Sequence, residues 1–425
     1  MPPSKSSVSS RQPAAFPASG MTATGPTGSA GLAWEQRLLE ELAKGSDLLP
    51  LDVLGQKFVV RWGTAVSRQQ RVSMRSAWAR CISTGEPQLP PVPPEPATGS
   101  RFTASVSSTS ANHPAATFQL AAGSFEELAE NLTSRLTVAA IMANAGELTM
   151  LHACGVAHPA TGAVVALVAR SGTGKTTAAS VLARTYGYVT DETVAIAWDG
   201  SVVPYPKPLS VKQLAGTPKR QASPDEFRLQ VAPASPYIQS IVLLNRVSGD
   251  LPVAPVLERV PLADAVLALV PESSSQAEVV DPLQSLCRLI ESVGGVWRVT
   301  YSEAADLPSA LEPLFRLQTA TKTEWAPAAA RSIHQPQIPA GHLQRTTPKD
   351  AVSIAGDLLI MLDNQIVRLS GIGPAVWEAC ANPVSLDGIT KQVGSVHGKP
   401  EGYREVISGV VERLVAKSIL ERASN

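Results

Sequence analysis

The chain has 425 residues, which on a loose scale of about 150 residues per domain predicts two or three domains. Its 36 basic and 36 acidic side chains balance, so no strong field favours nucleic acid or a membrane surface as partner. No apolar run approaches the roughly 20 residues that cross a bilayer, and the start of the chain lacks the apolar segment of a secretory signal. We therefore expect a cytoplasmic protein without a nucleic-acid or membrane partner.

The four cysteines are far apart and form no Cys-x-x-Cys pair, so neither a zinc site nor a redox dithiol is indicated. A reducing cytosol is the simplest setting for them, and we expect small buried side chains. They are Cys81, Cys154, Cys287 and Cys380.

The first part of the chain is expected to be a disordered tail, 1–30, and then a small α+β module with a proline-rich linker, 31–147. The tail is rich in Ser, Pro, Ala, Gly and Thr, so it cannot bury enough apolar surface to become ordered. Ser83–Ala116, with the run Pro90–Pro96, is expected to be a linker or long loop, and a proline-groove ligand is the alternative.

Hydrophobic spacing predicts the elements of this module. Ser124 and Glu127 have capping-box spacing ahead of a leucine repeat, which predicts a helix over about 125–143. The other expected elements are a helix bearing Trp34, Leu38 and Leu42, a hairpin of Leu51–Leu54 and Lys57–Trp62 around Gly55-Gln56, and a helix bearing Met74, Trp78 and Cys81.

The central segment carries the clearest motif. Ala163–Val168 is a continuous apolar, β-branched run, which predicts a strand buried on both faces, as in a parallel sheet. Ala169–Thr176 (ARSGTGKT) fits the P-loop or Walker A pattern GxxxxGK[ST], with alanine in first place. A helix over Thr176–Thr185 is expected to follow, with Gly187 as its stop.

This order of strand, loop and helix suits phosphate binding. Gly172 and Gly174 let backbone N–H groups turn inward, and the helix N-terminus adds partial positive charge. Lys175 would neutralise the β- and γ-phosphates, and the Thr176 hydroxyl would reach magnesium; a purely structural glycine loop is the alternative. The predicted nucleotide-binding residues are Ala169, Arg170, Ser171, Gly172, Thr173, Gly174, Lys175, Thr176 and Thr177.

A short strand over Tyr188–Thr190 is expected to end at Asp191 and Glu192. Because α/β sheets bind ligands at the carboxyl ends of their strands, these carboxylates could coordinate magnesium or accept the proton of an attacking hydroxyl. A solvated turn is the alternative. A hairpin of Val194–Trp198 and Val202-Val203 is expected to follow.

Leu148–Ile196 resembles the catalytic core of the HPr kinase/phosphorylase family. That family has a histidine before a Gly-Val step, a strand, the P-loop, a helix, and then an Asp-Asp pair. Matched position by position, those sites fall on His152, Lys175, Thr176, Asp191 and Glu192. On pattern alone, a satisfied core histidine would be the default for His152.

The resemblance implies an α/β core of HPr-kinase type with a P-loop over 148–320, and ATP and Mg²⁺ as cofactors. It implies catalytic roles for Asp191, Glu192, His152 and Lys175, with Asp191 as the general base, and magnesium ligands at Thr176, Asp191 and Glu192. Because the second acid is Glu192 and the family's later dephosphorylation loop is not found, neither phosphorylase activity nor HPr as substrate is expected. A homo-oligomer is implied as possible.

The end of the chain, 348–425, resembles PqqD and is expected to follow a linker over 321–347. The resemblance implies a winged-helix-like module to which a peptide adds as a strand. The expected elements are strands Asp357–Met361 and Gln365–Leu369, a helix with Trp377, a helix capped by Ser385, a helix face of Val406, Val410 and Leu414, and a strand at Ser418–Leu420. Eight basic against nine acidic side chains from Pro348 onward argue against DNA as the ligand of this module.

Together these patterns predict an ATP-dependent kinase for a Ser- or Thr-type hydroxyl on a peptide or small protein, such as a ribosomally made precursor. Two alternatives stay open: an accessory protein of peptide maturation that binds or hydrolyses ATP without phosphotransfer, and a kinase of small molecules.

Overall fold

The structure is a computed structural model that describes residues 47–83, 101–108, 117–170, 172–214, 216–249, 253–316, 324–328 and 338–423. The expected tail (1–30), the helix around Leu38, the proline run Pro90–Pro96 and Ser171 lie outside these residues. Asp47–Asn425 forms one compact unit of mixed α/β structure with several sheets. No helix in the described part of the chain is long and apolar enough to cross a membrane.

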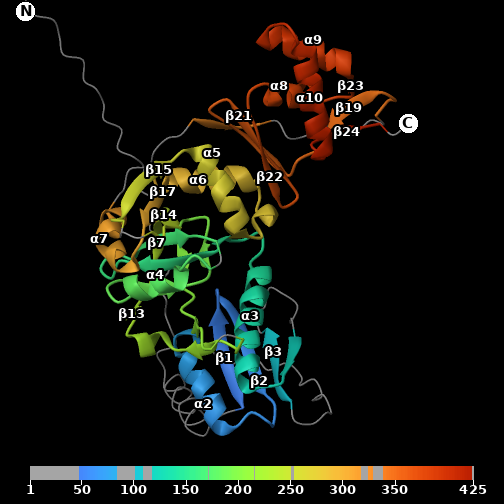
Figure 1. Cartoon of the computed structure of the whole chain (residues 1–425). Helices are drawn as coiled ribbons and strands as arrows, with labels where there is room; N and C mark the ends of the chain where they lie inside the picture. The colour runs from blue at the N-terminus through green and yellow to red at the C-terminus, as the bar shows by residue number, and fades with distance from the viewer. Residues whose placement is uncertain are drawn as a thin grey trace, which may run out of the picture. The chain divides into compact units, whose positions relative to one another are not determined.

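The largest sheet has seven strands (Figure 1), and the glycine-rich segment follows β7 (Ala163–Val168), one of its inner strands. Strands β8, β7, β14 and β17 run in one direction, whereas β6 and β15 run in the opposite one. The sheet is therefore mixed rather than purely parallel. Its strands in spatial order are β13 (Gln230–Val231), β8 (Gly187–Thr190), β6 (Ala153–Ala157), β7 (Ala163–Val168), β14 (Tyr237–Arg246), β17 (Val296–Tyr301) and β15 (Val256–Val260).

Strand β7 is buried on both faces, as predicted. Val164, Ala166 and Val168 point into one core and the residues between them point into another, as the two-residue repeat of a strand requires. Helices α4 and α7 cover one face and α5 and α6 the other (Figure 1). Their bounds, with the adjoining 3₁₀ turns, are α4 (Lys175–Leu182), η5 (Ala304–Asp306), α7 (Leu307–Leu311), η6 (Glu312–Phe315), α5 (Leu262–Leu269), η3 (Val270–Glu272), η4 (Gln276–Glu278) and α6 (Pro282–Ser292).

Gly187 does not stop α4, which ends four residues earlier at the cap residue Ala183. It begins β8 instead, where a neighbouring segment passes so close that a Cβ on Gly187 would lie 2.6 Å from the Cα of Ala232. The glycine is therefore explained by backbone approach and not by a helix cap.

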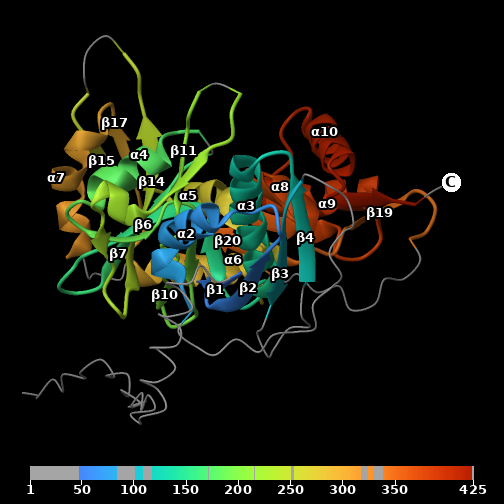
Figure 2. The same ribbon diagram turned by 90° about the horizontal axis from the view of Figure 1, so that it is seen from below.

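The amino-terminal module is a four-stranded antiparallel sheet with α3 packed against it (Figure 2). The hairpin is confirmed, but its turn is Leu54-Gly55, one residue earlier than expected, and both residues have positive φ. The bounds are β1 (Leu48–Val53), β2 (Gln56–Trp62), α2 (Arg68–Ala77), η1 (Ala79–Cys81), β3 (Phe102–Ser108), β4 (Thr117–Ala122) and α3 (Phe125–Ala143).

The linker expected over Ser83–Ala116 is wrong for Phe102–Ser108, because β3 is an inner strand of this sheet. Helix α3 has the predicted bounds. Ser124 caps it by accepting from the Glu127 N–H, while the Glu127 carboxylate accepts from the N–H of Gly123 instead of that of the cap residue.

A further four-stranded sheet is built from strands that alternate in the sequence with those of the large sheet. It contains the predicted hairpin of β9 and β10. Its strands in spatial order are β10 (Val202–Val203), β9 (Val194–Ile196), β5 (Thr149–Leu151) and β16 (Ser273–Ser274). A separate two-stranded sheet consists of β11 (Leu209–Val211) and β12 (Arg220–Ala222), and the 3₁₀ turn η2 (Pro224–Phe227) follows it.

The carboxyl-terminal part holds two small sheets and three helices. The predicted strand pair, the Trp377 helix and the Ser385 cap are confirmed. The bounds are β18 (Trp325–Pro327), β20 (Asp350–Ile354), β21 (Asp357–Leu362), β22 (Gln365–Leu369), β23 (Val384–Ser385), β19 (His342–Arg345), β24 (Leu420–Arg422), α8 (Gly373–Ala379), α9 (Leu386–His397) and α10 (Tyr403–Ala416).

Two expectations for this part are corrected. The stretch 321–347 is not only a linker, since β18 pairs with β20 and β19 is the middle strand of a three-stranded sheet. Leu414 is buried in α10 as expected, but Ile407 and Val411 take the places expected for Val406 and Val410, and Val406 is exposed.

Strands β20 and β21 are shared between two cores. Val352, Leu359 and Met361 pack with the helices on the large sheet, whereas Ala351 and Ile360 pack with α8 to α10. The carboxyl-terminal strands therefore belong to the same compact unit as the large sheet. All four cysteines are free and buried, as predicted.

Candidate functional site

Strand direction brings the predicted site residues to one edge of the large sheet. The carboxyl ends of β7 and β8 lead into the glycine loop (Ala169–Thr176) and into Asp191 and Glu192. Because β6 runs in the opposite direction, its amino end lies at the same edge, and His152 precedes it. Residues from three separate parts of the sequence therefore meet where α/β sheets bind ligands.

The glycine loop has the backbone shape that the motif requires. Gly172 and Gly174 have φ of +83° and +98°, which side-chain-bearing residues rarely adopt. Gly174 forms the N-cap of α4, so the free N–H groups and the positive end of the helix face the loop. A Cβ on Gly172 would meet nothing within 4 Å, so the loop has room for a ligand group on that side.

Lys175 is buried, and its ammonium group donates to backbone carbonyls of its own loop, those of Ala169 and, at 3.1 Å, Arg170. Burial lowers the pKa of Lys175, against the opposing charges of Glu272 and the nearby acidic pair. The ammonium group is therefore held inside the loop that it would share with a phosphate.

Thr176 and Asp191 connect the loop to the end of the neighbouring strand. The Thr176 hydroxyl donates to the Asp191 carboxylate at 3.1 Å. The other oxygen of Asp191 accepts from the buried Tyr188 hydroxyl at 3.0 Å. A hydroxyl and a carboxylate in contact at this position form two adjacent oxygen ligands of the kind that magnesium prefers.

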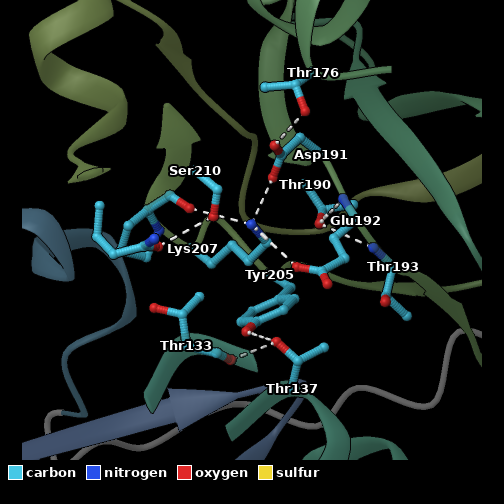
Figure 3. Close-up of polar contacts among 12 residues, drawn as sticks. Thr133, Thr137, Thr176, Thr190, Asp191, Glu192, Thr193, Tyr205, Lys207 and Ser210 are labelled. Carbon is cyan, nitrogen blue, oxygen red and sulfur yellow. Dashed lines mark hydrogen bonds and ion pairs between the residues drawn. The ribbon is translucent and has the colours of Figure 1, made fainter. Parts of the chain in front are cut away.

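A buried lysine, Lys207, links both acidic residues (Figure 3). Its ammonium group lies 3.0 Å from Asp191 Oδ1 and 3.1 Å from Glu192 Oε2, and it donates to the carbonyl of Pro208 at 3.2 Å. Burial alone would lower the pKa of Lys207, but the two carboxylates outweigh burial and raise that pKa above its ordinary value. Lys207 is therefore a charged counter-ion of the pair.

The segment that carries Lys207 is anchored to the amino-terminal module. The Tyr205 hydroxyl lies 2.7 Å from the Thr137 hydroxyl on α3 (Figure 3). The Tyr205 N–H donates to the carbonyl of Val189 on β8, and the Lys207 N–H donates to the carbonyl of Tyr205. Helix α3 and β8 thus fix the backbone from which Lys207 reaches the acidic pair.

His152 is half-buried beside the acidic pair and Glu272. Its backbone N–H donates to the carbonyl of Glu272 at 2.6 Å, and the N–H of Ala153 donates to the carbonyl of Glu192 at 3.1 Å. Burial and then the charge of Lys175 lower the pKa of His152, although Glu192 and Glu272 oppose them. The lowered pKa favours the neutral form of the imidazole.

Arg246 adds a cation on the other side of the loop. It ends β14, the strand next to β7, and its guanidinium group would lie 3.8 Å from a Cβ placed on Gly174. Its Nε donates to the carbonyl of Ser302 at 3.1 Å. An exposed guanidinium group beside the loop suits an anionic ligand.

Lys175, Thr176, Asp191, Glu192 and His152 lie at the same edge of the large sheet. Thr177 is exposed on the first turn of α4, and Arg170 is exposed on the loop. Sequence reasoning missed four site residues: Tyr188, Lys207, Arg246 and Glu272. Only Arg246 had a usable signal, because it follows the apolar run Ile241–Leu244 at a strand's carboxyl end.

The protein atoms alone do not complete a metal site. In the described ranges, no group of three or more His, Cys, Asp or Glu side chains could hold a metal ion. Magnesium usually retains waters and takes one or two carboxylates together with phosphate oxygens of the substrate. The adjoining oxygens of Thr176 and Asp191 fit such a partial set, which a nucleotide would complete.

Comparison with known proteins adds no family to this description. The chain matches no protein-family model and no curated protein sequence.

Proposed function

We propose that this chain is an ATP- and magnesium-dependent kinase that phosphorylates a Ser- or Thr-type hydroxyl on a peptide or small protein. The observation that carries the proposal is the contact of Thr176 on the glycine loop with Asp191 after the next strand, 3.1 Å apart. A loop hydroxyl and a strand-end carboxylate are the two protein groups that hold magnesium in phosphoryl transfer on P-loops. The resemblance to HPr kinases over Leu148–Ile196 supports the same reading.

Each side chain would have a separate task in that reaction. Backbone N–H groups of the glycine loop and the start of α4 would hold the β- and γ-phosphates. Lys175 would leave the loop carbonyls and neutralise charge on the transferring phosphoryl group. Arg246 would neutralise charge on the same group from the opposite side of the loop. Thr176 and Asp191 would hold magnesium, which when bound would supply neutralisation of the charge that develops on the phosphates.

The PqqD-like segment would supply the acceptor. Its strand β22 lies at the edge of a four-stranded sheet, where an extended peptide can add as a further strand. Binding there would raise the local concentration of the peptide near the glycine loop, as tethering does. The eight basic and nine acidic side chains of this segment favour a peptide over nucleic acid.

Lys175→Ala tests the proposal. The full chain is incubated with ATP, magnesium and peptides encoded beside its gene, and phosphate gain is measured by mass spectrometry. The variant should lose about 100-fold or more of the transfer rate and keep its peptide affinity. Lys219→Ala, which removes a half-exposed lysine on the surface, is the matched control.

Three outcomes would contradict the proposal in different ways. Undiminished transfer by the Lys175 variant would exclude the glycine loop as the phosphate site. ADP release without phosphate gain on any peptide would favour the accessory ATPase. Transfer to small alcohols but not to peptides would favour a kinase of small molecules.

A further inference from the structure

The two acidic residues at the end of β8 have different surroundings. The Asp191 side chain is 3% exposed, and both of its oxygens are engaged, by Tyr188 and Lys207 on one side and by Thr176 on the other. The Glu192 side chain is 35% exposed, and only its Oε2 meets a cation. The second oxygen of Glu192, Oε1, has no hydrogen-bond partner among the described residues.

A general base must come within hydrogen-bond reach of the hydroxyl proton that it removes. Asp191 is buried and held in place by three contacts, two on Oδ1 and one on Oδ2, so its carboxylate is fixed toward Thr176 and Lys207. The Glu192 side chain is partly exposed, and Lys207 holds its Oε2, so Oε1 could accept a proton without loss of that contact.

We infer that Glu192, and not Asp191, is the general base that accepts the proton of the acceptor hydroxyl. Asp191 then serves as a fixed magnesium ligand, and Lys207 is a positioning residue that orients Glu192. This assignment rests on the proposed kinase function. It reverses the order that the family resemblance implies, in which the first acid of the pair is the base.

The reaction step balances in this arrangement. The acceptor oxygen forms a bond to the γ-phosphorus of ATP as its proton passes to Glu192 Oε1. The bond between that phosphorus and the β–γ bridging oxygen breaks, and ADP leaves with the electron pair. When water is the acceptor, the same step gives ADP and phosphate, so slow ATP hydrolysis reports on the same base.

Chemical rescue distinguishes the two acids. The variants are Glu192→Ala, Asp191→Ala and the exposed control Glu312→Ala. Each is assayed as the full chain for transfer to a synthetic Ser- and Thr-containing peptide library, for ATP hydrolysis and for the Kd of Mg-ATP. Sodium formate and acetate serve as external bases that enter the space left by the removed side chain.

Glu192→Ala should lose about 10²- to 10⁴-fold of the rate, keep the Kd of Mg-ATP within a few-fold, and recover part of the rate with formate. Asp191→Ala should bind Mg-ATP more weakly and recover nothing. The assignment is overturned if Glu192→Ala keeps its rate, or if formate rescues Asp191→Ala alone.

The same assays separate this inference from the proposed function. If the wild-type chain hydrolyses ATP but phosphorylates no peptide, the kinase proposal fails, while rescue of hydrolysis still decides the base. If the wild-type chain binds Mg-ATP but neither hydrolyses ATP nor transfers phosphate to a peptide, both the kinase proposal and the assignment of Glu192 as base are refuted. Glu192→Asp, which keeps a shorter carboxylate, should retain more rate than Glu192→Gln if a proton acceptor is what matters.

Discussion

At the scale of single residues, the buried charge of Lys207 is the least expected feature. It is 2% exposed and contacts two carboxylates, so removing it leaves negative charges without their cation. Breaking a buried ion pair from one side costs about 3–5 kcal/mol. Lys207→Met should therefore lower the free energy of unfolding by that amount in urea titrations near neutral pH.

The pH dependence of this loss has a definite sign. The folded-state pKa of Lys207 is raised, so its stabilisation is complete below the unfolded value of about 10.4 and disappears as the pH rises through the higher folded value. The stability gap between wild type and Lys207→Met should hold up to about pH 10 and close above it.

Two matched variants make the Lys207 measurement specific. Lys391→Met removes a 71% exposed lysine paired with Asp387 and should cost less than about 1 kcal/mol. Lys207→Arg keeps the charge and should cost less than Lys207→Met. If Lys207→Met and Lys391→Met lowered the free energy of unfolding equally, the buried ion pairs of Lys207 would contribute no more to stability than an exposed ion pair.

At the scale of elements, a side chain from β20 caps a helix that packs on the large sheet. The cap position of α6 is Asp281, whose side chain makes no capping bond. Asp350 takes its place and accepts from the N–H groups of Leu283 and Gln284 at 2.9 and 3.0 Å. Since Asp350 is 2% exposed, these donors would be left unpaired without it.

Asp350→Ala should therefore destabilise the chain by about 1–3 kcal/mol. Hydrogen exchange should rise at the first turn of α6 as well as in β20. Ser385→Ala, which removes the cap of α9 within the carboxyl-terminal part, is the control and should affect α9 alone. Unchanged exchange in α6 would mean that Asp350 does not act as its cap.

Elements set by local chemistry could be predicted, and elements set by distant partners could not. Helix α3 has its cap, repeat and length in its own residues, so its predicted bounds hold. Strand β3 (FTASVSS) has small polar residues at alternate positions, and only its place between β2 and β4 makes it an inner strand. The shift of the α10 face has the same cause, because Val406 and Ile407 are equally apolar and packing selects one.

The site divides along the same line. The glycine loop follows directly after β7, and the acidic pair follows directly after β8. Each motif is contiguous in the sequence, so its residues could be named from the sequence. Lys207 reaches the pair from a segment between two prolines, and Tyr205 is held by Thr137 on α3, 68 residues earlier. No spacing rule connects such positions, since the fold alone brings them together.

At the scale of the whole molecule, the large sheet and the carboxyl-terminal strands share a core. Val352, Ile354, Leu359 and Met361 are buried with α5 and α6. Burial of each such side chain contributes about 1.5–3 kcal/mol, before the entropy cost of ordering it is subtracted. Removing these strands would expose the apolar residues of α5 and α6 that they cover, so the large sheet should lose stability.

Deleting Pro348–Asn425 should accordingly lower Tm strongly and weaken nucleotide binding in calorimetry, whatever the module recognises. Lys391→Ala, which removes an exposed lysine of the same segment, should leave both unchanged. An unaltered Tm after the deletion would show that the carboxyl-terminal strands contribute nothing to the large core. Because the deletion removes core residues, lost turnover would not show peptide recognition.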